Sequence, residues 1–319
     1  MGDLRRYWLP SVDVARSYRR AWLRDDLVAG IVLTALLIPA GIGYAEVSGL
    51  PPVTGLYATI VPLLVYAVVG PSRILVLGPD SSLAPIIGAS ILPLAAGDPD
   101  RAVALAGLLS ILMGVFLLIG GIFRLGFVTD LLSKPIRIGY LNGIALVVII
   151  DQVPKLLGFS VDADGAVDGV TEAVRGIGDG EIEPRAAAIG ILSLVGIIVL
   201  KRVRSRVPGV LLAVIVSGVV VAAMGWRDEL PVVGSLPQGL PAPALGGLTF
   251  DDVTSLLGPA LGIAVIAFAD TGVLSRVFAA RRGENVSGSQ EMRAIGLSNI
   301  ASGAMGGFAV SASSSRSSG

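Results

Sequence analysis

The chain has 319 residues, of which 53% are hydrophobic and only 15% are charged, with a mean hydropathy of +0.81. Its 24 basic and 24 acidic residues balance, so no basic excess points to nucleic acid as a partner. Cysteine and histidine are absent, which excludes disulfide frameworks, thiolate metal sites and histidine-based catalysis. Because a soluble chain of this length could not bury so much apolar surface, the composition indicates an integral membrane protein.

Apolar stretches of roughly the length that crosses a bilayer, about 20 residues, recur along the chain. Residues 1–25 precede them, carry several arginines, and predict an amphipathic segment at the cytoplasmic membrane surface. Residues 26–319 are predicted to form the transmembrane domain. The predicted spans are Leu27–Ala45, Thr54–Val69, Ala102–Phe123, Ile138–Ile150, Ala186–Leu200, Val207–Met224 and Val253–Ala269, with shorter or broken pieces at Ile74–Ala96 and Ala294–Val310.

The distribution of lysine and arginine predicts the orientation. Alternating the loops from a cytoplasmic N-terminus places eighteen basic residues on one side and five on the other. The positive-inside rule then predicts a multi-pass protein of the plasma membrane with its N-terminus in the cytoplasm. The loops Gly158–Pro184 and Trp226–Asp252 fall outside, and both are rich in glycine and acidic residues. We expect them to be solvated connectors.

The third span contains a break. Ile74–Leu77 is a short run typical of a strand, and Gly78-Pro79 interrupts it before Asp80, Ser81 and Ser82, which favour the start of a helix. A helix from Ser81 to Ala96 would be about 24 Å long and too short to cross the bilayer alone. We therefore predict a half-helix that begins near mid-membrane. The alternative is a full helix that starts at Ser81 near one surface.

The end of the chain repeats this pattern. Gly306-Gly307 precedes the apolar run Phe308–Val310, and the polar residues Ser311–Arg316 then favour a helix start. Broken third and tenth spans imply two seven-span repeats, the second inverted because seven is odd. The positive ends of two half-helices would then face each other and bind an anion. The alternative for this stretch is a flexible serine-rich tail.

Asp80 and Asp270 are the two acidic residues expected deepest in the bilayer. A charge there costs about 2.5–3.5 kcal/mol on insertion scales, so such residues indicate function, although Asp80 could simply cap a helix. A carboxylate repels a neighbouring anion until it is protonated, which suggests uptake of H⁺ with the anion. Arg316 is the candidate cation of the pocket or a solvated tail residue, and Tyr44 either closes the pocket or packs.

An ordered set of motifs then resembles the sulfate permease (SulP) family of anion transporters, from about residue 20 to the end. The motifs are Leu37–Ala45, Ser48–Tyr57, Gly70–Arg73, Gly78-Pro79, Phe268–Thr271, Ser275–Ala279, Gln290-Glu291, Asn299, Gly306–Phe308 and Ser315-Arg316. The resemblance implies an all-α integral membrane protein with the seven-plus-seven inverted-repeat transporter fold. It also implies short strands before the half-helices of spans 3 and 10, and core and gate domains.

The resemblance also implies a substrate pocket between spans 3 and 10, lined by spans 1 and 8. The matching positions are Ala40 and Tyr44 in span 1, Asp80, Ser81 and Ser82 in span 3, the coupling acid Asp270 in span 8, and Ser315 and Arg316 in span 10. The sequence departs from the family pattern at Ala40 (commonly Gln or Glu), Asp270 (usually Glu), Ala309 (usually Pro) and Ser314 (usually Phe). The chain stops at Gly319 inside span 10, so about ten segments are expected, without spans 11–14 or the regulatory STAS domain.

The expected function is secondary active transport of a small anion, such as sulfate, bicarbonate or a dicarboxylate, coupled to H⁺ or Na⁺ or by exchange. The alternatives are an anion channel and a truncated fragment that does not transport. No enzyme motif is found, and no cofactor or bound metal is expected. The expected partners are the anion, the coupling ion and the lipid bilayer, and the resemblance also allows a homodimer.

Overall fold

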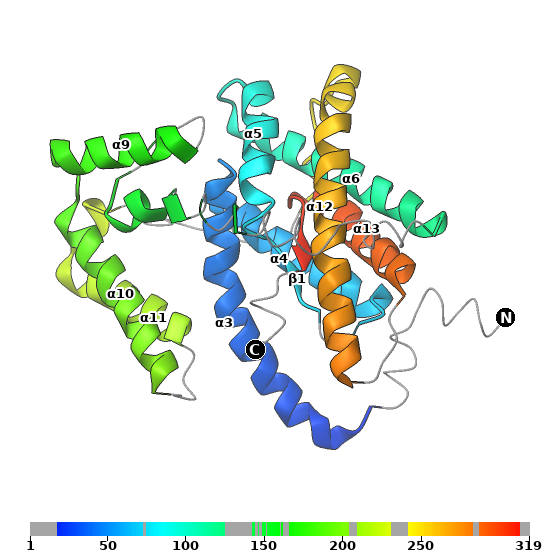
Figure 1. Ribbon diagram of the computed structural model, residues 1–319, viewed down its shortest axis with the longest axis horizontal. Helices are drawn as coiled ribbons and strands as arrows, with labels where there is room; N and C mark the ends of the chain where they lie inside the picture. The colour runs from blue at the N-terminus through cyan, green and yellow to red at the C-terminus, as the bar shows by residue number, and fades with distance from the viewer. Residues whose placement is uncertain are drawn as a thin grey trace. The chain divides into compact units, whose positions relative to one another are not determined.

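A computed structural model describes residues 18–72, 75–124, 152–159, 166–203, 209–230, 242–282 and 287–312, with isolated positions between 142 and 161. Within these residues the chain is mainly helical, with one two-stranded sheet (Figure 1). The chain divides into two compact units. The first unit comprises Met1–Leu132 and Leu236–Gly319, and the second comprises Ser133–Ser235.

The first unit contains most of the described elements. They are η1 (Arg20–Trp22), α3 (Leu23–Val47), α4 (Pro52–Val69), β1 (Leu77–Gly78), α5 (Ala84–Ala95), α6 (Pro99–Ile122), α12 (Phe250–Arg282), α13 (Gly288–Ala304) and β2 (Ser311–Ala312). The second unit contains α9 (Ala166–Asp179), α10 (Pro184–Arg202), α11 (Gly209–Met224) and η3 (Trp226–Asp228).

The starts of several helices follow from local chemistry. Helices α4, α5, α6 and α10 each carry proline in the first or second position, where no intrahelical N–H bond is lost. Asp98 caps α6, since its Oδ1 accepts from the backbone N of Asp100 at 2.9 Å and of Arg101 at 3.2 Å. For α4, α6 and α10 the observed starts lie two or three residues before the apolar stretches that predicted them.

Five helices are long and apolar enough to cross a membrane, which confirms five of the predicted spans. They are Arg20–Val47, Pro52–Val69, Pro99–Ile122, Pro184–Arg202 and Phe250–Thr271. Helix α5 and the stretch Leu212–Met224 are shorter and apolar. Most of the predicted span Ile138–Ile150 lies outside the described residues, as do residues 1–17 of the predicted N-terminal segment.

Helix α13 packs against α6 without intervening side chains. A Cβ added at Gly114 would lie 2.5 Å from the carbonyl O of Gly296, and one added at Gly107 would lie 2.7 Å from that of Gly303. Seven residues after Gly114, a Cβ added at Gly121 would lie 2.8 Å from the carbonyl O of Ser289. The small residues recur every seven positions on both helices, so the two backbones touch along their whole length.

The prediction of a broken span over Ala294–Val310 was wrong at its start. The structure shows a regular helix from Gly288 to Ala304. Its buried face is largely polar, since Glu291, Arg293, Ser298, Asn299 and Ser302 are each at most 3% exposed. The hydroxyl of Tyr66 on α4 donates to Glu291 Oε2 at 2.7 Å. Apolar length cannot detect a helix that buries polar side chains in a protein core.

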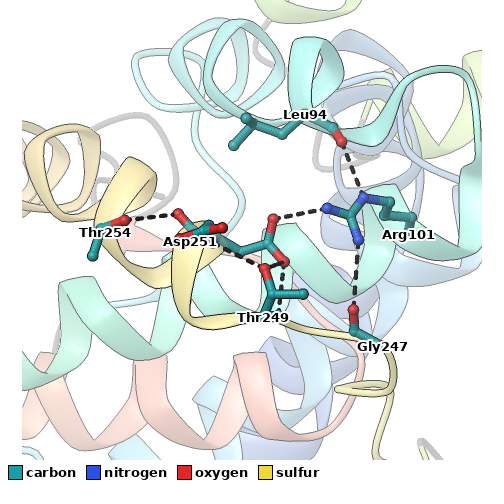
Figure 2. Close-up of polar contacts among 7 residues, drawn as sticks. Leu94, Arg101, Gly247, Thr249, Asp251 and Thr254 are labelled. Atoms are coloured by element: carbon teal, nitrogen blue, oxygen red, sulfur yellow. Dashed lines mark hydrogen bonds and ion pairs between the residues drawn. The ribbon is translucent and has the colours of Figure 1, made fainter.

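Arg101 near the start of α6 joins three parts of the first unit (Figure 2). Its Nε donates to the carbonyl O of Leu94 in α5 at 3.0 Å, and its Nη2 donates to Asp252 Oδ1 in α12 at 2.8 Å. Its Nη1 lies 3.5 Å from the carbonyl O of Gly247. The other oxygen of Asp252 accepts from the N–H and the hydroxyl of Thr249, both at 2.8 Å. The guanidinium therefore fixes the end of α5 against the start of α12.

The loop Gly158–Pro184 is not only a connector, as the sequence predicted, because it contains the 14-residue helix α9. Val167, Val170, Val174 and Ile177 recur at helical spacing, a periodicity that the acid- and glycine-rich composition of the loop obscures. The ring of Phe159 lies over Gly176, where a Cβ would come within 2.7 Å of it. In the second unit α10 and α11 form an antiparallel pair of apolar helices.

We expect Gly114→Ala to lower the thermal midpoint of the detergent-solubilised protein, because the added methyl would overlap the backbone of α13. Overpacking of this kind costs about 1–3 kcal/mol. Gly262→Ala on α12 is the matched control, since a Cβ there meets nothing within 4 Å and alanine favours a helix. Equal midpoints for the two variants would contradict the close contact of α6 and α13.

We expect Arg101→Ala and Asp252→Ala to lower the thermal midpoint by similar amounts, and the double variant to add little to either. The reason is that each single change leaves the other group without its partner. Arg175→Ala is the control, since the pair of Arg175 with Glu172 is exposed and should contribute almost nothing. Strictly additive losses in the double variant would argue against the coupling of α6 and α12.

Candidate functional site

The two broken segments of the chain meet in the core of the first unit. Strand β1 pairs antiparallel with β2, with Leu77 opposite Ala312 and Gly78 opposite Ser311. Both strands are buried, and Figure 1 shows β2, in red, beside α12. Strands that lie far apart in the sequence thus place the residues after Gly78 close to the end of the described chain.

The structure corrects the boundaries of both segments. Gly78 is part of β1, although we expected it to end the strand, and the helix of span 3 begins at Ala84 instead of Ser81. The carbonyl O of Asp80 accepts from the N–H groups of Leu83 and Ala84 at 3.2 and 3.0 Å, which makes Ser81–Leu83 a turn. Strand β2 occupies Ser311–Ala312, where the sequence predicted the opening of a helix.

Asp80, Ser82 and Asp270 form a polar cluster where α5 begins. The Ser82 hydroxyl lies 2.7 Å from Asp80 Oδ1 and 3.4 Å from Asp270 Oδ2 on α12, and the Ser82 N–H donates to Asp80 Oδ1 at 3.0 Å. Asp80 and Ser82 are less than 10% exposed. A hydroxyl has one proton, so Ser82 donates to only one carboxylate at a time. The second contact becomes a hydrogen bond when that carboxyl carries a proton.

Helix α5 points its N-terminus at this cluster. The helix has no acidic residue in its first turn, so its dipole contributes about half a unit of positive charge there. The Ser48 hydroxyl at the end of α3 donates to the carbonyl O of Ala84 at 3.1 Å and fixes α3 against the start of α5. The site therefore combines one positive helix end with two carboxyl groups.

Asn299 on α13 holds the approach to β2. Its carboxamide pairs with the backbone of Val310, accepting from its N–H at 2.8 Å and donating to its carbonyl O at 3.0 Å. The Ser302 hydroxyl donates to the carbonyl O of Phe308 at 2.8 Å. On α12, Thr271 Oγ1 lies 3.4 Å from the N–H of Ala312. Sequence motifs contained Asn299 and Thr271 but assigned them no role.

The other predicted site residues fall into two groups. Ala40, Tyr44 and Ser81 are half-buried, and Tyr44 packs against the hydrophobic core of the first unit. Ser315 and Arg316 lie outside the described residues. Among the residues that the structure describes, no group of three acidic side chains could hold a metal ion.

Comparison with known proteins gives concordant results. The model of the sulfate permease family matches residues 23–318. A "Probable sulfate transporter" of Mycobacterium tuberculosis (strain CDC 1551) is 41% identical over 310 residues, which cover 97% of this chain and 55% of that protein. Human solute carrier family 26 member 6 is 32% identical over 333 residues, covering 97% and 43%. The chain spans about half the length of the curated relatives it matches.

Solved structures share the fold. The murine solute carrier 26 family member A9 anion transporter, in the inward-facing state, matches with a TM-score of 0.88 at 20% identity, over 97% of this chain and 55% of that one. The transmembrane domain of a cyanobacterium bicarbonate transporter, BicA, matches with a TM-score of 0.80 at 21% identity, covering 94% and 77%.

These matches confirm the expected fold class, an all-α membrane protein with the inverted-repeat transporter fold and short strands in its broken segments. The family model covers nearly the whole chain. The chain belongs to the sulfate permease family.

Proposed function

We propose that the protein carrying this sequence is a secondary active transporter of small oxyanions, with sulfate the leading substrate. The observation that carries the proposal is the antiparallel pairing of β1 with β2, which brings the broken third segment beside Ser311–Ala312, while Ser82 lies next to Asp270 of α12. Relatives described as sulfate transporters support the substrate class. Bicarbonate and dicarboxylates are the other candidates, since the same helix end would attract any of them.

We propose a proton as the coupling ion, with Na⁺ as the alternative. The support comes from Ser82, whose single hydroxyl proton lies between the carboxyl groups of Asp80 and Asp270. An anion that approaches α5 meets both carboxylates, and protonation of one removes a repulsive charge and completes the second hydrogen bond. Proton and anion would thus bind together, which is the requirement for symport.

The same proposal includes the location. The excess of lysine and arginine on one set of loops supports a plasma-membrane protein with a cytoplasmic N-terminus, and the lipid bilayer as its surroundings. A homodimer is the proposed assembly. The mass of the solubilised protein by light scattering tests it.

An anion channel is the second candidate function, because a polar site between broken segments could also conduct. Counterflow in proteoliposomes that contain the full-length natural protein separates the two. A carrier accumulates labelled sulfate when unlabelled sulfate is present inside, whereas a channel carries current and shows no such stimulation. Current without counterflow would overturn the transporter proposal.

We expect Asp270→Asn and Asp80→Asn to flatten the pH dependence of anion uptake, since the amide is neutral at every pH. In the unaltered protein, uptake should rise as the pH falls and the carboxyl groups become protonated. Uptake of labelled sulfate, bicarbonate and fumarate across acidic to neutral pH is the measurement. Asp251→Asn is the control, because Asp251 is exposed in the first turn of the same helix. An unchanged pH profile in both variants would rule out coupling by these carboxyl groups.

We expect Arg316→Ala to weaken anion binding at neutral pH, because ionised Asp80 offsets the positive charge of the helix end and Arg316 restores it. The loss should be smaller in an Asp80→Asn background, where that negative charge is absent. Arg316→Lys should recover part of the affinity, since lysine lacks the planar pair of donors. Binding titrations in the two backgrounds test this, and an affinity that is insensitive to Arg316→Ala in both would remove Arg316 from the site.

A further inference from the structure

Helix α9 carries an apolar stripe that nothing in the described part of the chain covers. Val167 is 80% exposed, Val174 64%, Val170 46% and Ile177 44%. These residues follow one another at intervals of three or four, so they share one side of the helix. Four large exposed apolar side chains in a row would be costly in water.

The rest of α9 is divided between packing and charge. Gly169, Ala173 and Gly176 are buried and form the face that packs within the second unit, where Phe159 lies against Gly176. The charged residues fall on a third side of the helix, which faces away from the apolar stripe. They are Asp168, Glu172, Arg175 and Asp179. The helix thus has one face for protein, one apolar face and one charged face.

Helix α9 is held beside the start of the membrane-spanning helix α10. The linker between α9 and α10 has three residues, Gly180–Ile182. Glu183, the N-cap of α10, follows it. The N–H of Glu183 donates to the carbonyl O of Leu157 at 3.1 Å, and that of Glu181 donates to the carbonyl O of Gly176 at 3.0 Å. Figure 1 shows α9 crossing the N-terminal end of α10 instead of continuing its direction. The helix is therefore held beside the first turn of α10, a helix long and apolar enough to cross a membrane.

The exposed surface of α10 is apolar, like the stripe of α9. Leu192, Val195 and Val199 of that helix are 50% exposed or more, as expected for side chains that contact lipid tails. Both surfaces belong to the second unit. A bilayer surface can satisfy both the apolar and the charged face of α9 at once.

We propose that α9 is an interfacial helix that lies in the bilayer surface, with its valine and isoleucine side chains among the upper acyl chains and its charged side in water. Such helices bury their apolar face by about 5–10 Å. Three acidic residues against one arginine give α9 a net negative charge, so apolar burial holds it to the membrane and anionic lipid is not required. The helix would fix the depth of the second unit in the bilayer. The inference rests on membrane insertion alone and is independent of anion transport.

Site-directed spin labelling tests the proposal, since the chain has no native cysteine. Single cysteines at Val167 and Val174 are compared with the adjacent positions Asp168 and Arg175, and all four side chains are exposed, so the labels disturb no packing. The labelled protein, with serine in place of any cysteine outside these 319 residues, is reconstituted in phosphatidylcholine vesicles. Collision of the label with oxygen, which partitions into lipid, and with a nickel chelate, which stays in water, is then measured.

We expect the ratio of oxygen to nickel collision to be several-fold higher at Val167 and Val174 than at Asp168 and Arg175. Added phosphatidylglycerol should leave the ratios unchanged. Equal access of nickel to all four labels would overturn the proposal and return α9 to a solvated connector. Labels at Val167 and Val174 that neither reagent reaches would also overturn it, because a protein surface would then cover the stripe.

Discussion

The contact of α13 with α6 determines where the two strands of the candidate site lie. Glycines at every seventh position remove the side chains between the helices, so α13 enters the core of the first unit. Several of its polar residues are then buried: Tyr66 donates to one carboxylate oxygen of Glu291, and Asn299 and Ser302 bond the backbone of the segment that follows the helix. A larger residue at Gly296 or Gly303 would displace the helix from which Asn299 reaches β2.

The buried polar side chains of the first unit fix how its helices and strands are placed relative to one another. Asn299 and Ser302 bond the backbone on the way to β2, and Arg101 fixes α5 to α12 at another end of the same helices. The contacts of Arg101 link α5 and α12, the two helices beside the polar cluster around Ser82. The position of Asp270 relative to Asp80 therefore depends on residues that touch neither carboxyl group.

The sequence correctly predicted the features that depend on the length of apolar stretches and on glycine or proline breaks. Spans such as Ala102–Phe123 emerged as helices of the expected extent, and the two breaks emerged as strands. Helix α13 was misjudged because its buried face is polar, and α9 because its four apolar residues stand in an acidic loop. The shift of the start of span 3 to Ala84 came from backbone bonds to Asp80, which no side-chain pattern reveals. The roles of Ala40, Tyr44, Ser315 and Arg316 remain predictions.

The pairing of Asn299 with Val310 satisfies backbone groups that are buried next to the two-stranded sheet. A sheet of two short strands has edges, and bare sheet edges are not tolerated at membrane depth. Here single side chains bond the backbone in and beside β2: Asn299 pairs with Val310, which precedes the strand, and Thr271 lies beside Ala312. Such contacts satisfy buried backbone groups without a further strand. Loss of either contact would leave a buried backbone group without its partner, which would destabilise the end of the described chain.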